Sequence, residues 1–299
     1  MSMLARRITR GLSTSILWLL IAAYAAVTVI PDAFPRMFAS PFNVPAAVLL
    51  SLCFGLIHGA IRYGIGGIAV FLALCLGISN VMENIGVLTG FPFGHYHYTD
   101  VLGPKLFLVP LLIGPAYFGT GYLSWVLATV LLCTDQRRDR LPTFVVPVTA
   151  AFIMVGWDLC FDPAASTIAH MWIWENGGGY FGVPLTNFLG WYLTVYIFLQ
   201  LFAFCRSRRA LPGIVSLPRD YWYQPCVMFA VMALDYPAAY FGAKNVAVTD
   251  ATGRVWQAGD IYETAAIVSL CTMLFVACAS FAVVLLREAQ IDAPKPGQK

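Results

Sequence analysis

Acidic residues interrupt the most apolar parts of this sequence, and no basic residue stands beside them. Asp158 and Asp162 lie four positions apart in the stretch WDLCFDP, so a helix would carry both carboxyl groups on one face. Glu83 ends a third apolar segment, Glu263 begins a fourth, and Asp235 lies in the outer half of another. Acidic residues within membrane-spanning segments are energetically costly and mark function by default. The structural alternative for each of them is a helix cap or a solvated position at the membrane surface.

Carboxylic acids among aromatic rings in a dry site suit one kind of chemistry, the protonation of a carbon–carbon double bond. Burial raises the pKa of a carboxyl group in general, so the group can hold a proton at neutral pH. Aromatic faces would stabilise the resulting carbocation by about 2 kcal/mol each when desolvated. A second polar group would hold the water that attacks the cation. A substrate that needs this chemistry would be an isoprenoid dissolved in the bilayer.

The histidines argue against a metal centre. The four of them, His58, His95, His97 and His170, are too few for the di-iron sites of membrane desaturases and hydroxylases. His95 and His97 would point the same way from an extended loop, but a metal site needs further ligands at suitable geometry. We therefore expect hydrogen-bonding or proton-shuttling histidines and no metal. Phosphate-binding loops, dinucleotide fingerprints and nucleophile elbows are also absent from the sequence.

The elements that must position these acids are membrane-spanning helices. Of the 299 residues, 60% are hydrophobic and only 11% are charged, with a mean hydropathy of +0.75, whereas soluble domains carry about 25% charged residues. A span needs about 20 apolar residues. The candidate spans are 12–30, 44–60, 64–84, 106–133, 142–160, 187–205, 223–242 and 264–286. We predict an all-α, polytopic transmembrane bundle of seven to eight helices, a single membrane domain over residues 1–299 with a disordered tail at 287–299.

Basic residues set the orientation of such a bundle, because they gather on the cytoplasmic side. With eight spans and a cytoplasmic N-terminus, fourteen basic residues fall inside the cell and four outside. The fourteen are Arg6, Arg7, Arg10, Arg62, Arg137, Arg138, Arg140, Arg206, Arg208, Arg209, Arg219, Arg287, Lys295 and Lys299, and the four are Arg36, Lys105, Lys244 and Arg254. We predict a multi-pass protein of the plasma membrane with both termini in the cytoplasm. The net charge of +3 is then a topology signal, and no nucleic-acid partner is expected.

Two loops that follow the acids resemble each other. After Glu83 and after Asp158 the chain continues with glycine and aromatic residues and then a proline at the start of the next apolar segment. A diverged repeat of helical hairpins would produce this pattern. So would convergence, because tryptophan and tyrosine gather at membrane boundaries in unrelated segments.

Three segments of the sequence resemble a known family. They are ENIGVLTGFPFGHYHYTDVLGPKLFLVP (83–110), WDLCFDP (157–163) and WIWENGGGYFGVPLTNFLGW (172–191), so the resemblance is specific from about residue 80 to 200. The chain is similar to the carotenoid biosynthesis membrane proteins, which include hydratases of carotenoid end groups and of bacterioruberin precursors. The resemblance implies hydration of an end-group double bond of an acyclic or monocyclic carotenoid, giving a tertiary alcohol without a cofactor. It also implies a polyene isoprenoid substrate, the lipid bilayer and other carotenoid-pathway enzymes as partners.

Roles can be assigned to the positions that match the family. Asp158 is the favoured general acid because it should lie deeper than Asp162, and Asp162 or Glu83 would orient the water. His95 would serve as a proton relay beside the substrate, and His170 as another. The residues expected to bind the substrate are Phe93, His95, Tyr96, Tyr98, Trp172, Trp174, Tyr180, Asn187 and Trp191.

Three other functions fit parts of this pattern. A transporter or proton-coupled carrier would also have acids within broken membrane helices, but its acids would lie near the midplane instead of toward one surface. A cyclase or another isoprenoid-modifying enzyme would share the protonation step and omit the capture of water. A non-catalytic lipid-binding scaffold would give the desolvated acids no role.

Overall fold

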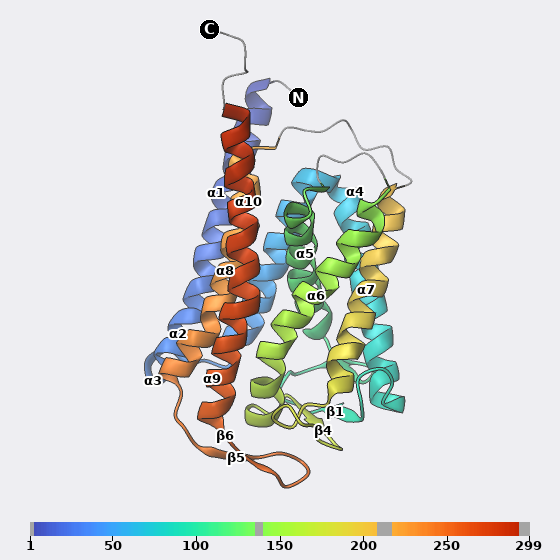
Figure 1. Ribbon diagram of the computed structural model, residues 1–299, viewed down its shortest axis with the longest axis vertical. Helices are drawn as coiled ribbons and strands as arrows, with labels where there is room; N and C mark the ends of the chain where they lie inside the picture. The colour runs from blue at the N-terminus through green and yellow to red at the C-terminus, as the bar shows by residue number, and fades with distance from the viewer. Residues whose placement is uncertain (1–2, 135–139, 208–216, 293–299) are drawn as a thin grey trace.

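The protein is a bundle of long helices with short strands at one end (Figure 1). The computed structural model describes residues 3–134, 140–207 and 217–292. The helices are α1 (Met3–Val27), α2 (Val29–Ala33), α3 (Pro35–Phe38), α4 (Asn43–Thr89), α5 (Ile113–Leu131), α6 (Pro142–Pro163), α7 (Leu185–Ser207), α8 (Arg219–Gly242), α9 (Ala258–Ser269) and α10 (Phe275–Asp292). Two π-helical turns, η2 (Ala164–Ile168) and η3 (Leu270–Leu274), extend α6 and join α9 to α10. This confirms the predicted all-α polytopic bundle.

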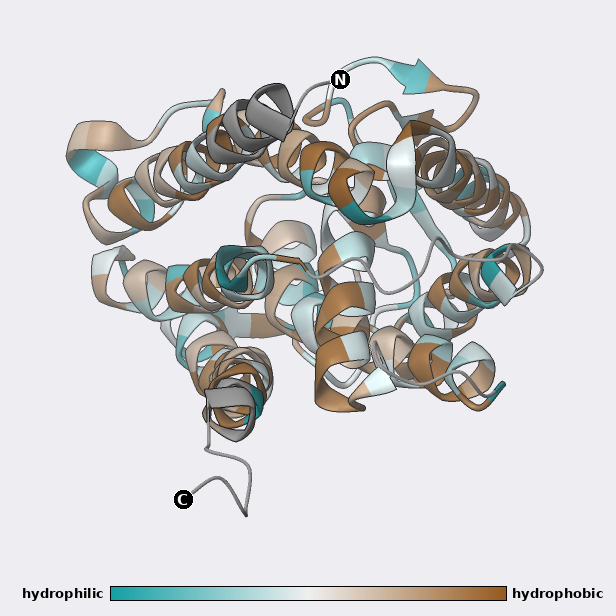
Figure 2. Cartoon of the chain, turned by 90° about the horizontal axis from the view of Figure 1, so that it is seen from above, coloured by the Kyte–Doolittle hydropathy of each residue, from teal (hydrophilic) through white to brown (hydrophobic). Residues whose placement is uncertain are grey.

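Six of the described helical segments are long and apolar enough to cross a membrane. They are Leu12–Ala33, Asn43–Thr89, Pro142–Ile168, Leu185–Ser207, Arg219–Gly242 and Ala258–Arg287. Large apolar side chains are exposed on them, among them Leu19 at 68% and Ile65 at 83%. Seen from above in Figure 2, hydrophobic residues lie on helices all round the bundle. An apolar outer surface of this extent belongs in a bilayer.

The helix α4 is two membrane crossings joined by a sharp turn. A straight helix of its 47 residues would measure about 70 Å, more than twice the roughly 30 Å of a hydrocarbon core. Gly64 breaks it with a φ of 69° and a ψ of 169°, values open to a residue without a side chain. Gly59 and Ile68, on opposite sides of this turn, lie against each other. The separate predicted spans at 44–60 and 64–84 are therefore the two arms of a hairpin, which Figure 1 shows running in opposite directions.

With α4 counted as two arms and α9, η3 and α10 as one segment, eight long helical segments make up the described part of the bundle. The central one is α5, whose side chains are buried continuously from Tyr117 to Val130. It packs against α4, α6 and α10, and α7 packs between α4 and α6. The start of α1 and the end of α10 lie at the same end of the bundle, as an even number of crossings requires (Figure 1). Which side of the membrane this end faces stays a prediction.

Two sequence predictions about element boundaries were wrong. The fourth span does not begin at residue 106, because residues 105–110 form an antiparallel hairpin of β2 (Lys105–Leu106) and β3 (Val109–Pro110). Proline at 104 and 110 disfavours helix there, and α5 begins only at Ile113. The tail is not disordered from residue 287, since α10 continues to Asp292. No glycine or proline stands between 287 and 292 to stop the helix. Residues 293–299 lie outside the described residues.

The strands at the far end from the termini join two distant loops. β1 (Tyr96–Tyr98) lies between α4 and α5, and it pairs antiparallel with β4 (Trp172–Trp174), which lies between α6 and α7. The register sets Tyr96 opposite Trp174 and Tyr98 opposite Trp172. Because side chains alternate along a strand, these four aromatic rings share the buried face. A second hairpin, β5 (Ala247–Thr249) and β6 (Val255–Gln257), lies at the same end (Figure 1).

Candidate functional site

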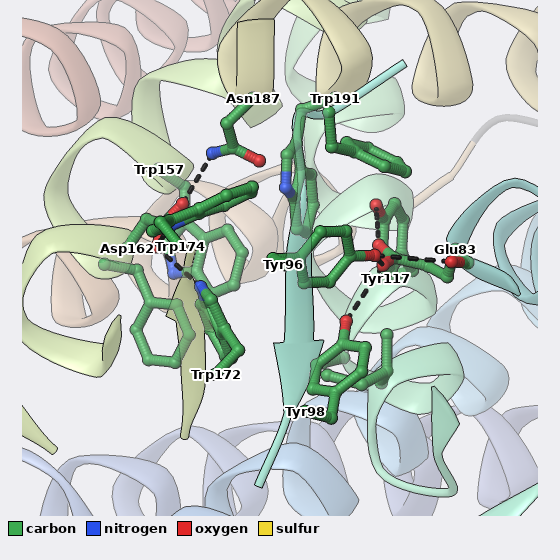
Figure 3. Close-up of a pocket in the computed structure, with 14 residues that line it drawn as sticks. Glu83, Tyr96, Tyr98, Tyr117, Trp157, Asp162, Trp172, Trp174, Asn187 and Trp191 are labelled. Atoms are coloured by element: carbon green, nitrogen blue, oxygen red, sulfur yellow. Dashed lines mark hydrogen bonds between the residues drawn. The ribbon is translucent and has the colours of Figure 1, made fainter. Parts of the chain in front are cut away.

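Three of the predicted acids lie together at this stranded end of the bundle. Glu83 is carried by the second arm of α4, and Asp158 and Asp162 are carried by the last turns of α6. All three are buried, with at most 3% of the residue surface exposed. Glu83 and Asp162 face a cavity of about 40 Å³ from opposite sides (Figure 3). A water molecule needs about 10–15 Å³ of such space, so the cavity has room for water beside a slender group.

Aromatic residues make up most of the wall of this space, which we call the acid–aromatic cavity. They are Phe93, Tyr96, Tyr98, Tyr117, Trp157, Phe161, Trp172, Trp174 and Trp191. Tyr117 stacks on Trp191 with ring centroids 4.1 Å apart, and Tyr96 packs against Trp174 at 4.9 Å. These contacts hold the rings in place around the cavity, where their faces can stabilise a cation.

Glu83 accepts hydrogen bonds from three tyrosines. The hydroxyl of Tyr117 donates to Oε1 at 2.7 Å, and that of Tyr98 donates to Oε2 at 2.9 Å. The hydroxyl of Tyr96 also bonds Oε2. Burial, with the nearby Glu83 carboxyl as a second cause, raises the pKa of Tyr96 and of Tyr98 well above the ordinary phenol value. Both phenols therefore keep their protons at neutral pH.

Asp162 is held by groups of a different kind. The indole N–H of Trp172 donates to Oδ1 at 2.8 Å, and that of Trp174 donates to the same oxygen at 3.3 Å. The amide of Asn187, on α7, donates to Oδ2 at 2.5 Å. An indole N–H can only donate, whereas a phenol can donate or accept. The Asp162 site thus favours a carboxylate, and the Glu83 site can accommodate a protonated or an ionised carboxyl.

Asp158 lies behind Asp162. Its Oδ2 accepts a hydrogen bond of 3.0 Å from the Asn187 amide, which links the two aspartates. Its Oδ1 is buried and has no hydrogen-bond partner among the described residues. Asp158 is not among the residues that line the acid–aromatic cavity. Of the two aspartates only Asp162 lines this cavity, and the catalytic role expected of Asp158 stays a prediction.

The remaining predicted substrate contacts divide into two groups. Phe93, Asn187 and Trp191 line the cavity together with the aromatic residues of β1 and β4. Tyr180 instead donates to the backbone oxygen of Leu159 at 3.1 Å, outside the lining. Glu263, also singled out among the acids, is exposed on α9.

The histidines lie away from the cavity. His95 packs against the end of α4 at Gly90, and His170 is exposed. His97 is exposed beside Glu175, with 3.1 Å between Nδ1 and Oε1. His58 is buried near the other end of the bundle, bonded to the Tyr122 hydroxyl at 2.6 Å and to the Tyr221 carbonyl at 2.7 Å.

Sequence reasoning missed three aromatic residues of the wall, and also Ile113 and Ala116. Tyr117 lies inside an apolar helix, and nothing in the sequence marked it as a third tyrosine for Glu83. Trp157 and Phe161 were quoted within the WDLCFDP motif but given no role. Their spacing could have revealed them. Trp157 and Phe161 directly precede the two aspartates and are four positions apart, so they lie on one face of the helix.

We expect strong chelators to leave the rate of the expected alkene hydration by purified membranes unchanged. Among the described residues, no group of three or more His, Cys, Asp or Glu side chains is arranged to hold a metal ion. Product formation would be measured before and after treatment with EDTA. Loss of activity that one divalent ion restores would contradict this prediction and would return attention to His95 and His97.

The ring of Phe93 packs against two glycines, Gly86 and Gly190, so a larger side chain at either glycine should disturb the packing of the ring. A methyl group on Gly190 would come within 2.6 Å of Phe93 Cδ1, and one on Gly86 within 2.6 Å of Cδ2. Gly190→Ala should therefore destabilise the protein by about 1–3 kcal/mol, as overpacking does elsewhere, and should lower activity. Gly77→Ala is the matched control, since a methyl group there meets nothing within 4 Å. Thermal unfolding in detergent would compare the two variants, and equal stabilities would contradict the prediction.

The fold and the site define a polytopic helical membrane protein with buried carboxyl groups facing an aromatic cavity at one end of the bundle. The chain belongs to the family described as carotenoid biosynthesis protein, which it matches over residues 43–249. It is similar to the bisanhydrobacterioruberin hydratase of Haloarcula japonica, with 32% identity over 135 residues. The similar region covers 44% of this chain and 43% of that relative, so the chain matches less than half of the relative's length. No solved structure matches the chain.

Proposed function

We propose that this protein is a carotenoid hydratase, which adds water to the end-group carbon–carbon double bond of an acyclic or monocyclic carotenoid. Membership of a carotenoid biosynthesis family and similarity to a hydratase support this function. The observation that carries it is the pair of unlike carboxyl sites in one cavity. Glu83 is bonded by hydroxyl groups that can donate or accept, and Asp162 is bonded by N–H donors. A hydration needs one group that gives a proton and another that takes one.

The first step would be protonation of the double bond. In this proposal the carboxyl group of Glu83 gives its proton to the less substituted carbon, whose new C–H bond takes the π electrons. The positive charge then lies on the tertiary carbon at the end of the chain. Tyr96, Tyr98 and Tyr117 would stabilise the Glu83 carboxylate left behind, because each hydroxyl already bonds that group.

The second step would be capture of the cation by water. The Asp162 carboxylate opposite Glu83 lowers the energy of the cation through its charge, and the surrounding rings add cation–π stabilisation. Water bonds to the tertiary carbon as Asp162 accepts one of its protons. Return of that proton to Glu83 through water in the cavity completes the cycle. The net reaction adds one water to one alkene and transfers no electrons to a cofactor.

Asp158 would act through its neighbour in this scheme. Asn187 donates to both aspartates, so Asp158 fixes the amide that in turn bonds Asp162. We therefore propose Asp158 as a positioning residue and assign contact with the substrate to Glu83 and Asp162. This differs from the role expected of Asp158 from sequence, because that expectation rested on depth alone.

Expression in cells that make lycopene tests the proposed function. A hydratase should convert lycopene to more polar pigments that gain the mass of one or two water molecules, detectable by chromatography with mass spectrometry. Growth in deuterated water should place deuterium on the carbon next to the new tertiary alcohol. A pigment of unchanged mass with a new ring would indicate a cyclase, and unchanged pigment with altered solute uptake would indicate a carrier.

A further inference from the structure

A second cavity adjoins the acid–aromatic cavity and is much larger, at about 270 Å³. We call it the long cavity. The two share part of their walls, formed by Ile113, Ala116, Trp157, Phe161 and Trp172. From this shared wall the long cavity extends between α1, the first arm of α4, α8 and α9. The two cavities therefore lie side by side, with these five residues between them.

Small side chains create the space in the long cavity. Seven alanines from the helical elements and the loop after η2 line it: Ala47, Ala116, Ala164, Ala165, Ala169, Ala239 and Ala265. Protein interiors are normally close-packed, with few voids larger than a water molecule. Sites for organic ligands begin at about 300 Å³, so this space approaches the size of a ligand site. Its lining is mainly apolar, which suits a hydrocarbon.

Exposed apolar residues stand next to the lining at the stranded end of the bundle. Phe42 is 75% exposed and precedes the lining residues Asn43 and Val44. Val101 and Leu111, more than half exposed, precede the lining residues Leu102 and Leu112. These exposed apolar side chains offer a hydrocarbon dissolved in the bilayer a contact surface beside the long cavity.

Two carboxyl groups restrict what can enter. Asp32 and Asp235 both line the long cavity. Among the described residues that line the cavity, none is a lysine or arginine. Anionic ligands such as fatty acids and phospholipid headgroups are repelled by such a pair, whereas an uncharged chain is not.

We propose that the long cavity binds the uncharged conjugated chain of the substrate while the reacting end group occupies the acid–aromatic cavity. This rests on the proposed function for the identity of the chain. The shared wall at Trp157 and Trp172 then separates the part of the substrate that reacts from the part that anchors it. Filling the long cavity should weaken substrate binding and spare the chemistry in the smaller cavity.

Variants that fill the long cavity test this proposal. Ala47→Phe and Ala265→Phe place rings in the long cavity away from the shared wall, and Ala47→Leu and Ala265→Leu do so more mildly. Ala22→Phe is the matched control, because Ala22 is exposed on α1 and lines neither cavity. Each protein is purified from cells that make an acyclic carotenoid and placed in nanodiscs, after its thermal stability is compared with wild type.

Two measurements decide the outcome. The amount of coloured carotenoid retained per protein should fall about tenfold or more in the filled variants. A few carbons added to a packed space commonly cause a loss of this size. They should also show a raised KM with kcat nearly unchanged, and the leucine variants should fall between them and wild type. Retention and KM equal to those of Ala22→Phe would overturn the proposal, as would fatty acid or phospholipid held in place of carotenoid.

The same measurements separate this inference from the proposed function. If wild type retains the carotenoid, filled variants lose it and no water is ever added, the chain-binding site stands and the hydratase function fails. If all variants hydrate the carotenoid with the wild-type KM, the hydratase function stands and the chain-binding site fails.

Discussion

Replacing Glu83 with glutamine should lower the rate of hydration by at least about 10²–10⁴-fold, the usual contribution of a positioned general acid. Glutamine keeps the length of the side chain and an oxygen that can accept from the tyrosine hydroxyl groups, but it has no proton to give to an alkene. The rate is measured as product formed per amount of protein in nanodiscs. Deuterium incorporation from heavy water detects the slow residual reaction.

A comparison within the same network controls for folding. Tyr117→Phe removes the 2.7 Å hydrogen bond to Glu83 and leaves the carboxyl group in place. It should therefore cost far less activity than Glu83→Gln. If a stably folded Glu83→Gln protein hydrates its substrate within tenfold of wild type, Glu83 is not the proton donor.

Asp162→Asn should be the second most damaging change. The asparagine amide would carry no negative charge beside the cation. Its NH2 group would replace a carboxylate oxygen that accepts a hydrogen bond, so one donor would face another donor. Loss of one electrostatic stabiliser of a transition state costs about 10²–10³-fold in kcat. Steady-state kinetics on the purified protein would measure this, with unfolding temperatures recorded alongside because the unmatched donors are buried.

Asp158→Asn is the matched control for this second prediction. It alters the same helix and bonds the same Asn187, but Asp158 does not line the acid–aromatic cavity. We expect a smaller loss of activity than for Asp162→Asn. A larger loss with normal stability would restore Asp158 as the general acid and would require the substrate to reach behind Asp162.

Hydropathy was sufficient to predict the bundle, because each crossing must be long and apolar. Even the break in α4 followed from the short gap between two apolar segments near Gly64. The segment at 105–110 was misassigned because hydropathy does not distinguish a short apolar hairpin from the start of a helix.

The acids of the site were predictable for a different reason, since buried carboxyl groups in apolar helices are rare. Their order around the cavity was not. Asp158 and Asp162 share one helix face, and four residues of rise could not show which would meet the cavity. Tyr117 was invisible because its partner Glu83 is 34 positions away in sequence and is brought near only by packing of α5 against α4.

The pairing of β1 with β4 also determines the stage of protein synthesis at which the site can assemble. Tyr96 and Trp174 lie opposite each other across the bundle end although α5 and α6 separate them in the chain. During synthesis, helices enter the membrane in sequence and associate afterwards. Glu83 and its tyrosines can assemble once α5 is in place, but Asp162 obtains its indole donors only after Trp172 and Trp174 have emerged and paired with β1. A nascent chain that stops before residue 172 would therefore contain Asp162 without its two indole donors, and maturation of the site would depend on the late pairing of β4 with β1.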